Sequence, residues 1–252
     1  MARAVIITSY LEYPVDLPSL LRPDDYIVCL DGGYDIAQRL AITPDLLLGD
    51  FDSIQVPLPE DPAGQGLQIL RYPPEKDYTE LELAFRILDP SKTPDLLVIG
   101  GLGGRLDQTL VNTQMLQQYT ASSEEDQPWE AGDFGFDQEP KYDFSPAGPD
   151  YGSPRKYRSI EIMDGRNRCF VVHGSDPSTH AVHTIPQEPD CYLSLLPLTE
   201  ECSGVSLTGV KYPLEGAVLR RGTSRSTSNE FRAEQAQLQL RSGSLLVVMA
   251  KA

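Results

Sequence analysis

Two acidic residues with one residue between them, Asp50 and Asp52, directly follow the apolar run 46–48. Alternate side chains of an extended segment point the same way, so both carboxylates should emerge together at the end of a buried strand. Carboxylate oxygens are ligands that Mg²⁺ prefers, and Mg²⁺ commonly binds the oxygens of a polyphosphate as well. This segment therefore predicts a site for a divalent metal and a phosphate group.

Three further segments repeat this theme: 31–33 (DGG), 76–80 (KDYTE) and 100–108 (GGLGGRLDQ). Each follows an apolar run or begins a plausible helix. In the third, Gly103 and Gly104 let backbone N–H groups approach an anion, and Arg105 adds a fork of donors. No Gly-Lys-Ser/Thr follows, so this is not a Walker A loop. Carboxylates at several such places cannot neutralise one another, which favours a magnesium-dependent nucleotide enzyme.

Each motif taken alone has a simpler explanation. Asp-Gly-Gly is usually a turn, and Asp-x-Asp is common on solvated loops. Segment 76–80 could simply open a helix, with Asp77 or Thr79 as the cap and Glu80 reaching back. The occurrence of all four motifs in one half of the chain favours the site.

Composition and charge narrow the classes of partner. The 252 residues carry a formal net charge of -16, which argues against nucleic acid and anionic membrane surfaces as partners. The four cysteines have no C-x-x-C spacing and indicate neither a zinc site nor a disulfide framework. No apolar run approaches the roughly 18 residues of a membrane span. We expect a soluble, cytoplasmic protein.

The two halves of the chain have different sequence patterns, which predict different folds. Apolar runs at 5–7, 27–30, 46–48, 67–70 and 96–99 alternate with helical patterns at 34–40, 79–88 and 107–119. This predicts an α/β domain with a mainly parallel sheet and with ligands at the carboxyl ends of its strands. Strand-like runs at 159–163, 169–173, 191–196, 205–210 and 245–249 predict an all-β C-terminal sandwich or barrel. We place the domains at 1–119 and 158–252, with an acidic insertion or mobile loop at 120–157.

A second cluster of polar and aromatic residues lies in the β-rich half. Tyr212 offers a stacking face, while Ser226, Ser228 and Asn229 offer hydrogen-bond donors and acceptors. Together they could bind a small heteroaromatic ligand. The Ser/Thr-rich run alone would be explained better as a turn between strands.

These motifs, in this order, resemble those of the thiamine pyrophosphokinase (thiamine diphosphokinase) family. The similar segments are 31–33, 44–45 with 49–53, 76–80, 103–108 with Asn112, 212–214 and 226–229. The chain departs from the family pattern at Gln108, where many bacterial members have His. The 120–157 segment is also longer than the usual connection.

The resemblance implies a fold, a reaction and a set of site residues. The family joins an α/β nucleotide-binding catalytic domain to a β-sandwich that binds thiamine, and it works as a homodimer with thiamine near the subunit interface. It transfers the pyrophosphoryl group of ATP to the hydroxyl of thiamine and releases AMP. The implied catalytic residues are Asp50, Asp52, Asp77, Arg105 and Asp107, of which Asp50, Asp52 and Asp77 would hold Mg²⁺. The implied nucleotide-site residues are Asp31, Gly32, Lys76, Thr79, Gly103, Gly104, Gln108 and Asn112, and the thiamine-site residues are Tyr212, Ser226, Ser228 and Asn229.

Two alternative functions stay open at this point. One is a pyrophosphokinase that acts on another hydroxyalkyl heterocycle, which would keep the aspartates and change the pocket around Tyr212. The other is a non-catalytic thiamine or nucleotide sensor. The complete aspartate set counts against a sensor, because a sensor has no need of a full metal site.

Overall fold

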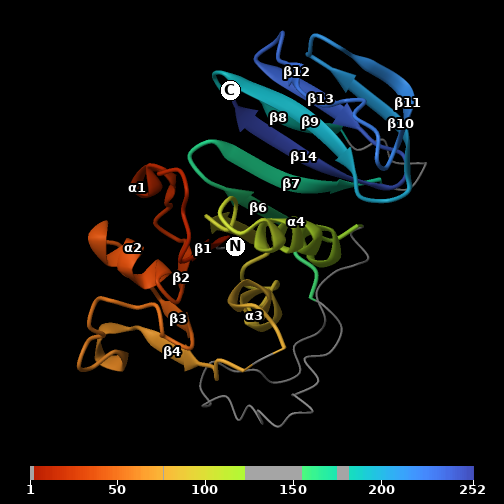
Figure 1. Ribbon diagram of the computed structural model, residues 1–252. Helices are drawn as coiled ribbons and strands as arrows, with labels where there is room; N and C mark the ends of the chain where they lie inside the picture. Colours follow the sequence, from red (N-terminus) through yellow and green to blue (C-terminus); the bar gives the residue numbers. More distant parts are fainter. Residues whose placement is uncertain (1–2, 76, 123–154, 175–181) are drawn as a thin grey trace.

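The computed structural model describes residues 3–75, 77–122, 155–174 and 182–252 (Figure 1). Its first half contains β1 (Arg3–Ile7), α1 (Leu17–Leu20), β2 (Tyr26–Leu30), α2 (Gly33–Arg39), β3 (Leu46–Gly49), the 3₁₀ turn η1 (Ala63–Gln65), β4 (Gln68–Arg71), α3 (Glu80–Ile87), β5 (Asp95–Ile99) and α4 (Leu106–Tyr119). The second half contains β6 (Ser159–Met163), β7 (Asn167–His173), β8 (Val182–Pro186), β9 (Cys191–Pro197), β10 (Glu201–Thr208), β11 (Leu214–Arg220), β12 (Asn229–Glu230), β13 (Gln235–Gln239) and β14 (Ser244–Lys251).

One long sheet runs through both halves. Its ten strands are ordered β12-β9-β14-β7-β6-β5-β1-β2-β3-β4. From β4 through β3, β2, β1 and β5 to β6, successive strands pair in parallel. From β6 through β7, β14 and β9 to β12, successive strands pair antiparallel. A second sheet, ordered β11-β10-β13-β8, is antiparallel and stacks on the far end of the first (Figure 1).

Three buried clusters hold these layers together. Helices α3 and α4 bury Phe85 and Leu116 against one face of the long sheet, where the cluster extends to Val171 on β7. Helix α2 and the segment around Leu17 cover the other face. Between the two sheets lies a third cluster that includes Leu195 on β9. The alternation of side chains along each strand supplies opposite faces to different clusters.

The predicted fold class is confirmed: a mainly parallel α/β half is followed by an antiparallel sandwich. Helix α3 begins at Glu80, and the Thr79 hydroxyl caps it by accepting from the Glu82 amide at 3.2 Å. Strands β8, β11, β12 and β13 and the short α1 were not predicted.

The domain limits stay predictions. Strand β6, the first strand after the predicted boundary at residue 158, pairs in parallel with β5 of the first half. The same sheet therefore continues across that boundary. Residues 123–154 of the predicted insertion lie outside the described residues. Among the helices that the structure describes, none is both long and apolar enough to cross a membrane.

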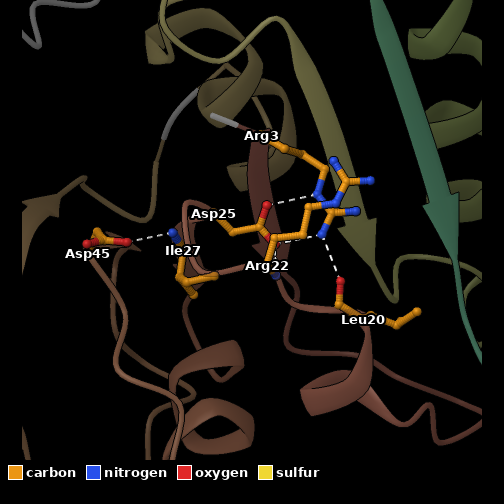
Figure 2. Close-up of polar contacts among 6 residues, drawn as sticks. All are labelled: Arg3, Leu20, Arg22, Asp25, Ile27 and Asp45. Atoms are coloured by element: carbon orange, nitrogen blue, oxygen red, sulfur yellow. Dashed lines mark hydrogen bonds and ion pairs between the residues drawn. The ribbon is translucent and has the colours of Figure 1, made fainter. Parts of the chain in front are cut away.

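A buried ion pair fastens the amino ends of the first two strands (Figure 2). The Arg3 guanidinium lies 2.6 Å from the carboxylate of Asp25, whose side chain is fully buried. Arg3 also donates to the carbonyl of Leu20 at 2.9 Å, and Asp25 accepts from the Arg22 amide at 2.8 Å. Nearby, the Asp45 carboxylate accepts from the Ile27 amide at 2.7 Å. These contacts fix the edge of the sheet opposite to the strand ends that carry the acidic motifs.

Removal of Arg3 should therefore destabilise the fold. In Arg3→Met a buried carboxylate loses its cation, which we expect to lower the free energy of unfolding by about 3 kcal/mol. Urea unfolding at neutral pH measures this. Arg3→Met combined with Asp25→Asn should be more stable than Arg3→Met alone, because no unpaired charge is then buried. A double variant no more stable than the single one would contradict this explanation.

Candidate active site

Three carboxylates come together at the carboxyl edge of the parallel sheet. Asp31 follows β2 and is buried, while Asp50 and Asp52 follow β3 and are progressively more exposed. One oxygen from each lies within 4.8 Å of the other two. The pairing of Leu30 with Leu48 brings these two strand ends side by side. An oxygen-rich group of this kind is chemically suited to Mg²⁺.

The backbone around β3 is shaped to hold this group. Gly49 has φ +153°, and a Cβ built there would lie 1.7 Å from the Asp31 Oδ1 atom. The same oxygen accepts from the Phe51 amide at 3.0 Å, and Phe51 itself has φ 70°. Asp50 accepts from the Asp52 amide at 3.2 Å. The sequence therefore needs glycine at position 49 so that Asp31 can lie against the strand.

The glycine-rich loop after β5 faces the loop after β1. Strand β1 lies between β5 and β2 in the sheet. The strands that follow β1 in sequence, β2 to β4, lie on one side of it, and β5 lies on the other side. Such a switch point is where open α/β sheets bind ligands. The Gly104 amide donates to the Glu12 carboxylate at 3.1 Å, and a Cβ at Gly103 would lie 1.7 Å from that carboxylate. The loop predicted to bind an anion thus contacts an anionic group of the protein itself, the carboxylate of Glu12.

Glu12 was not identified from the sequence. A signal in the sequence was that residues 8–12 follow the apolar run 4–7, as segments 31–33 and 49–53 also follow apolar runs.

The start of α4 carries the predicted Arg105 and Asp107. They form an exposed ion pair, with Arg105 Nε 3.1 Å from the Asp107 carboxylate. The hydrogen bond from Arg105 holds the pKa of Asp107 below its ordinary value. Asn112, which is buried one turn further along α4, donates to the Gly101 carbonyl at 2.8 Å and so ties the glycine-rich loop to the helix. Gln108 lies in the first turn of α4.

The loop before α3 carries the predicted Lys76, Asp77 and Thr79. Asp77 is exposed, and the structure groups Asp50 and Asp52 with Asp31 instead. Thr79 caps α3, so its hydroxyl has a structural task. Lys76 lies outside the described residues. Gly32 adjoins the cluster, and its amide donates to the Ser53 hydroxyl at 3.1 Å.

At the far end of the sandwich, two hydrogen bonds join Asn229 and Tyr212. The Tyr212 amide donates to the Asn229 side-chain oxygen at 3.0 Å, and the Asn229 side-chain nitrogen donates to the Tyr212 carbonyl at 2.8 Å. Asn229 is buried, whereas 61% of Tyr212 is exposed. The buried amide therefore fixes the backbone that presents the aromatic ring.

The two predicted serines, Ser226 and Ser228, attach the turn before β12 to strand β9 by hydrogen bonds. The Ser226 hydroxyl donates to the Leu195 carbonyl at 2.9 Å, and the Ser228 amide donates to the Ser194 hydroxyl at 3.0 Å. Both serines have positive φ, 75° and 54°. The structure thus brings Tyr212, Ser226, Ser228 and Asn229 to one end of the sandwich, and gives three of them positioning contacts.

The Arg105–Asp107 pair allows a direct test by titration. In Arg105→Met the lost hydrogen bond should raise the pKa of Asp107, so its carboxylate should protonate at a higher pH than in the unmodified protein. NMR titration of side-chain carboxyl carbons measures this. Asp95 serves as the control: burial raises its pKa, but hydrogen bonds from Arg158 and Ser159 outweigh burial and keep it low. Its titration should not change in Arg105→Met. An unchanged Asp107 titration would show that the pair does not persist in solution.

Comparison with known proteins finds a family model over each half of the chain. The family model described as "Thiamin pyrophosphokinase, catalytic domain" matches residues 17–126. A second, "Thiamin pyrophosphokinase, vitamin B1 binding domain", matches residues 180–245. The thiamine pyrophosphokinase of Bacillus subtilis (strain 168) is 27% identical over 212 residues, which cover 82% of this chain and 78% of the relative. Thiamin pyrophosphokinase 1 of Caenorhabditis elegans is 26% identical over 219 residues, 83% of this chain and 73% of the relative.

Solved structures show the same fold over the whole chain. The crystal structure of thiamine pyrophosphokinase from Bacillus subtilis superposes with a TM-score of 0.72 at 20% identity, and covers 100% of this chain and 99% of that one. Thiamin pyrophosphokinase from Candida albicans gives a TM-score of 0.63 at 18% identity, with 100% and 89% covered. The two family models occur in the expected order and match most of the sequence. The chain belongs to the thiamine pyrophosphokinase family.

Proposed function

We propose that this protein transfers the pyrophosphoryl group of ATP to the hydroxyl of thiamine, giving thiamine diphosphate and AMP. The observation that carries the proposal is the group formed by Asp31, Asp50 and Asp52 at the carboxyl edge of the sheet, in a chain matched by both domains of the family. A net charge of -16 also favours the approach of cationic thiamine.

The donor set fits magnesium. All three grouped residues are carboxylates, and hard divalent cations prefer oxygen ligands. In this proposal Asp50 and Asp52 hold Mg²⁺ with Asp31 beside them, and Asp77 completes the set from the loop before α3. Bound Mg²⁺ would neutralise charge on the polyphosphate oxygens during transfer.

The remaining residues orient the reacting groups. The thiamine oxygen forms a bond to the β-phosphorus while the bond from that phosphorus to the oxygen of AMP breaks, and the hydroxyl proton passes to a carboxylate. Asp107 is the proposed acceptor, and Arg105 beside it grips phosphate oxygens. Most of the rate enhancement in such a transfer comes from in-line positioning and charge stabilisation.

The positions of the two site halves support a homodimer. In the strand order, β12 with Asn229 and β3 with the acidic group are eight spacings apart, roughly 40 Å at the usual strand separation. Figure 1 shows the same wide separation between β12 and β3. Thiamine held at Tyr212 therefore cannot reach the aspartates of the same chain. A second copy brings the two halves together.

The first turns of α4 supply a surface for that second copy. Leu106, Leu110 and Val111 are 69%, 50% and 42% exposed, and they lie on the helix that begins beside Arg105. Apolar side chains grouped on a surface commonly mark an interface. We place the sandwich of the partner against this part of α4. A cytoplasmic location is also proposed, and four free, buried thiols fit a reducing compartment.

The reaction is tested by its products. Purified protein with ATP, Mg²⁺ and thiamine should give AMP and thiamine diphosphate in equal amounts by chromatography. Asp52→Asn should lower the rate roughly 100-fold or more while the fold is retained, because Mg²⁺ loses a charged oxygen ligand and then stabilises the polyphosphate charge less well. Asp24→Asn, an exposed aspartate before β2, is the control and should retain the rate. Formation of ADP and thiamine monophosphate, or a normal rate in Asp52→Asn, would contradict the proposal.

A further inference from the structure

We propose that Arg86 is a positioning residue, which fixes the segment that carries Asp77 by clamping the ring of Tyr78 onto α3. The inference rests on the proposed function, in which Asp77 acts at the metal and phosphate site. No motif in the sequence pointed to Arg86.

The guanidinium of Arg86 lies between two aromatic rings. Its central carbon is 4.1 Å from the centroid of the Tyr78 ring and 6.0 Å from that of the Tyr119 ring. Tyr78 precedes the helix cap, and Arg86 comes two turns later, so the ring folds back along the helix. A cation over an aromatic face is attracted to it, and more strongly where water is excluded.

Glu82 holds the guanidinium at this place. Arg86 donates to one Glu82 oxygen from Nε at 3.1 Å and from Nη2 at 2.9 Å. The Tyr119 hydroxyl donates to the same oxygen at 2.9 Å. Only 11% of the Arg86 side chain and 20% of the Glu82 side chain are exposed, and Tyr119 on α4 is fully buried. The clamp therefore rests on both helices that cover this face of the sheet.

The clamp adds a second point of attachment to the loop before α3. Thr79 fixes the backbone at the helix cap. Tyr78, the next residue toward the amino end, is fixed through its ring. Asp77 lies one residue further and is exposed, so its position depends on these two attachments. An error of about 1 Å in a reacting group can cost about 100-fold in rate.

Four variants test the clamp. Tyr78→Leu removes the ring, and Arg86→Lys keeps the charge but loses the planar guanidinium. Each should lower kcat about tenfold and leave the KM for thiamine within about twofold, because the thiamine half lies elsewhere. Tyr78→Phe keeps the ring and should retain the rate. Arg158→Lys is the matched control, since Arg158 pairs with Asp95 at the opposite edge of the sheet.

A double variant tests whether Arg86 acts through Tyr78. If Arg86 acts through Tyr78, Tyr78→Leu combined with Arg86→Lys should be no slower than the slower single variant. Losses that multiply, or single variants with normal kcat, would overturn the proposal.

Hydrogen exchange gives a readout that does not depend on activity. Amides of residues 78–80 should exchange faster in Tyr78→Leu and Arg86→Lys, while amides in the middle of α3 keep their protection. Equal exchange in all variants would contradict the clamp. If the unmodified protein made no thiamine diphosphate, the proposed function would fail, and faster exchange at 78–80 would still be expected.

Discussion

The backbone ladder on both sides of β6 ties the two halves of the molecule together. Along one side β6 pairs in parallel with β5, and along the other it pairs antiparallel with β7. The buried cluster under α3 and α4 continues across this junction, from Leu116 to Val171 on β7 and Leu246 on β14. Breaking the junction would leave backbone groups without partners and expose apolar surface, both of which are costly. The catalytic and sandwich halves are therefore parts of one sheet.

This constraint separates the predicted site residues into two places. The parallel strands end at an edge where Asp31, Asp50 and Asp52 gather, and the sandwich presents Tyr212 at the other end of the long sheet. Mutual repulsion at the acidic edge is best relieved by a cation, and a cation attracts phosphate. The hydrogen bonds of Asn229, Ser226 and Thr79 to the backbone show that several motif residues have a structural role.

Several parts of this arrangement could be predicted from the sequence, because they depend on local patterns. Continuous apolar runs identified the parallel strands, and residues directly after those runs formed the acidic edge. Strands β11 and β13 escaped detection because polar residues or glycine interrupt their apolar residues, and most of their residues are not buried. The place of Asp31 in the acidic group depends on the pairing of β2 with β3. The contact of Arg86 with Tyr78 spans eight residues, beyond the spacing of ordinary helix neighbours.

We propose that one active site takes its aspartates from one copy and its thiamine-binding residues from another. The most direct test mixes two impaired chains, Asp52→Asn and Tyr212→Ala, under conditions that let subunits exchange. A mixed dimer has one site in which both halves are intact, so thiamine diphosphate should form much faster than with either variant alone. If mixing gave no recovery while mass spectrometry confirmed mixed dimers, the site would lie within a single chain, and a shared active site would be contradicted.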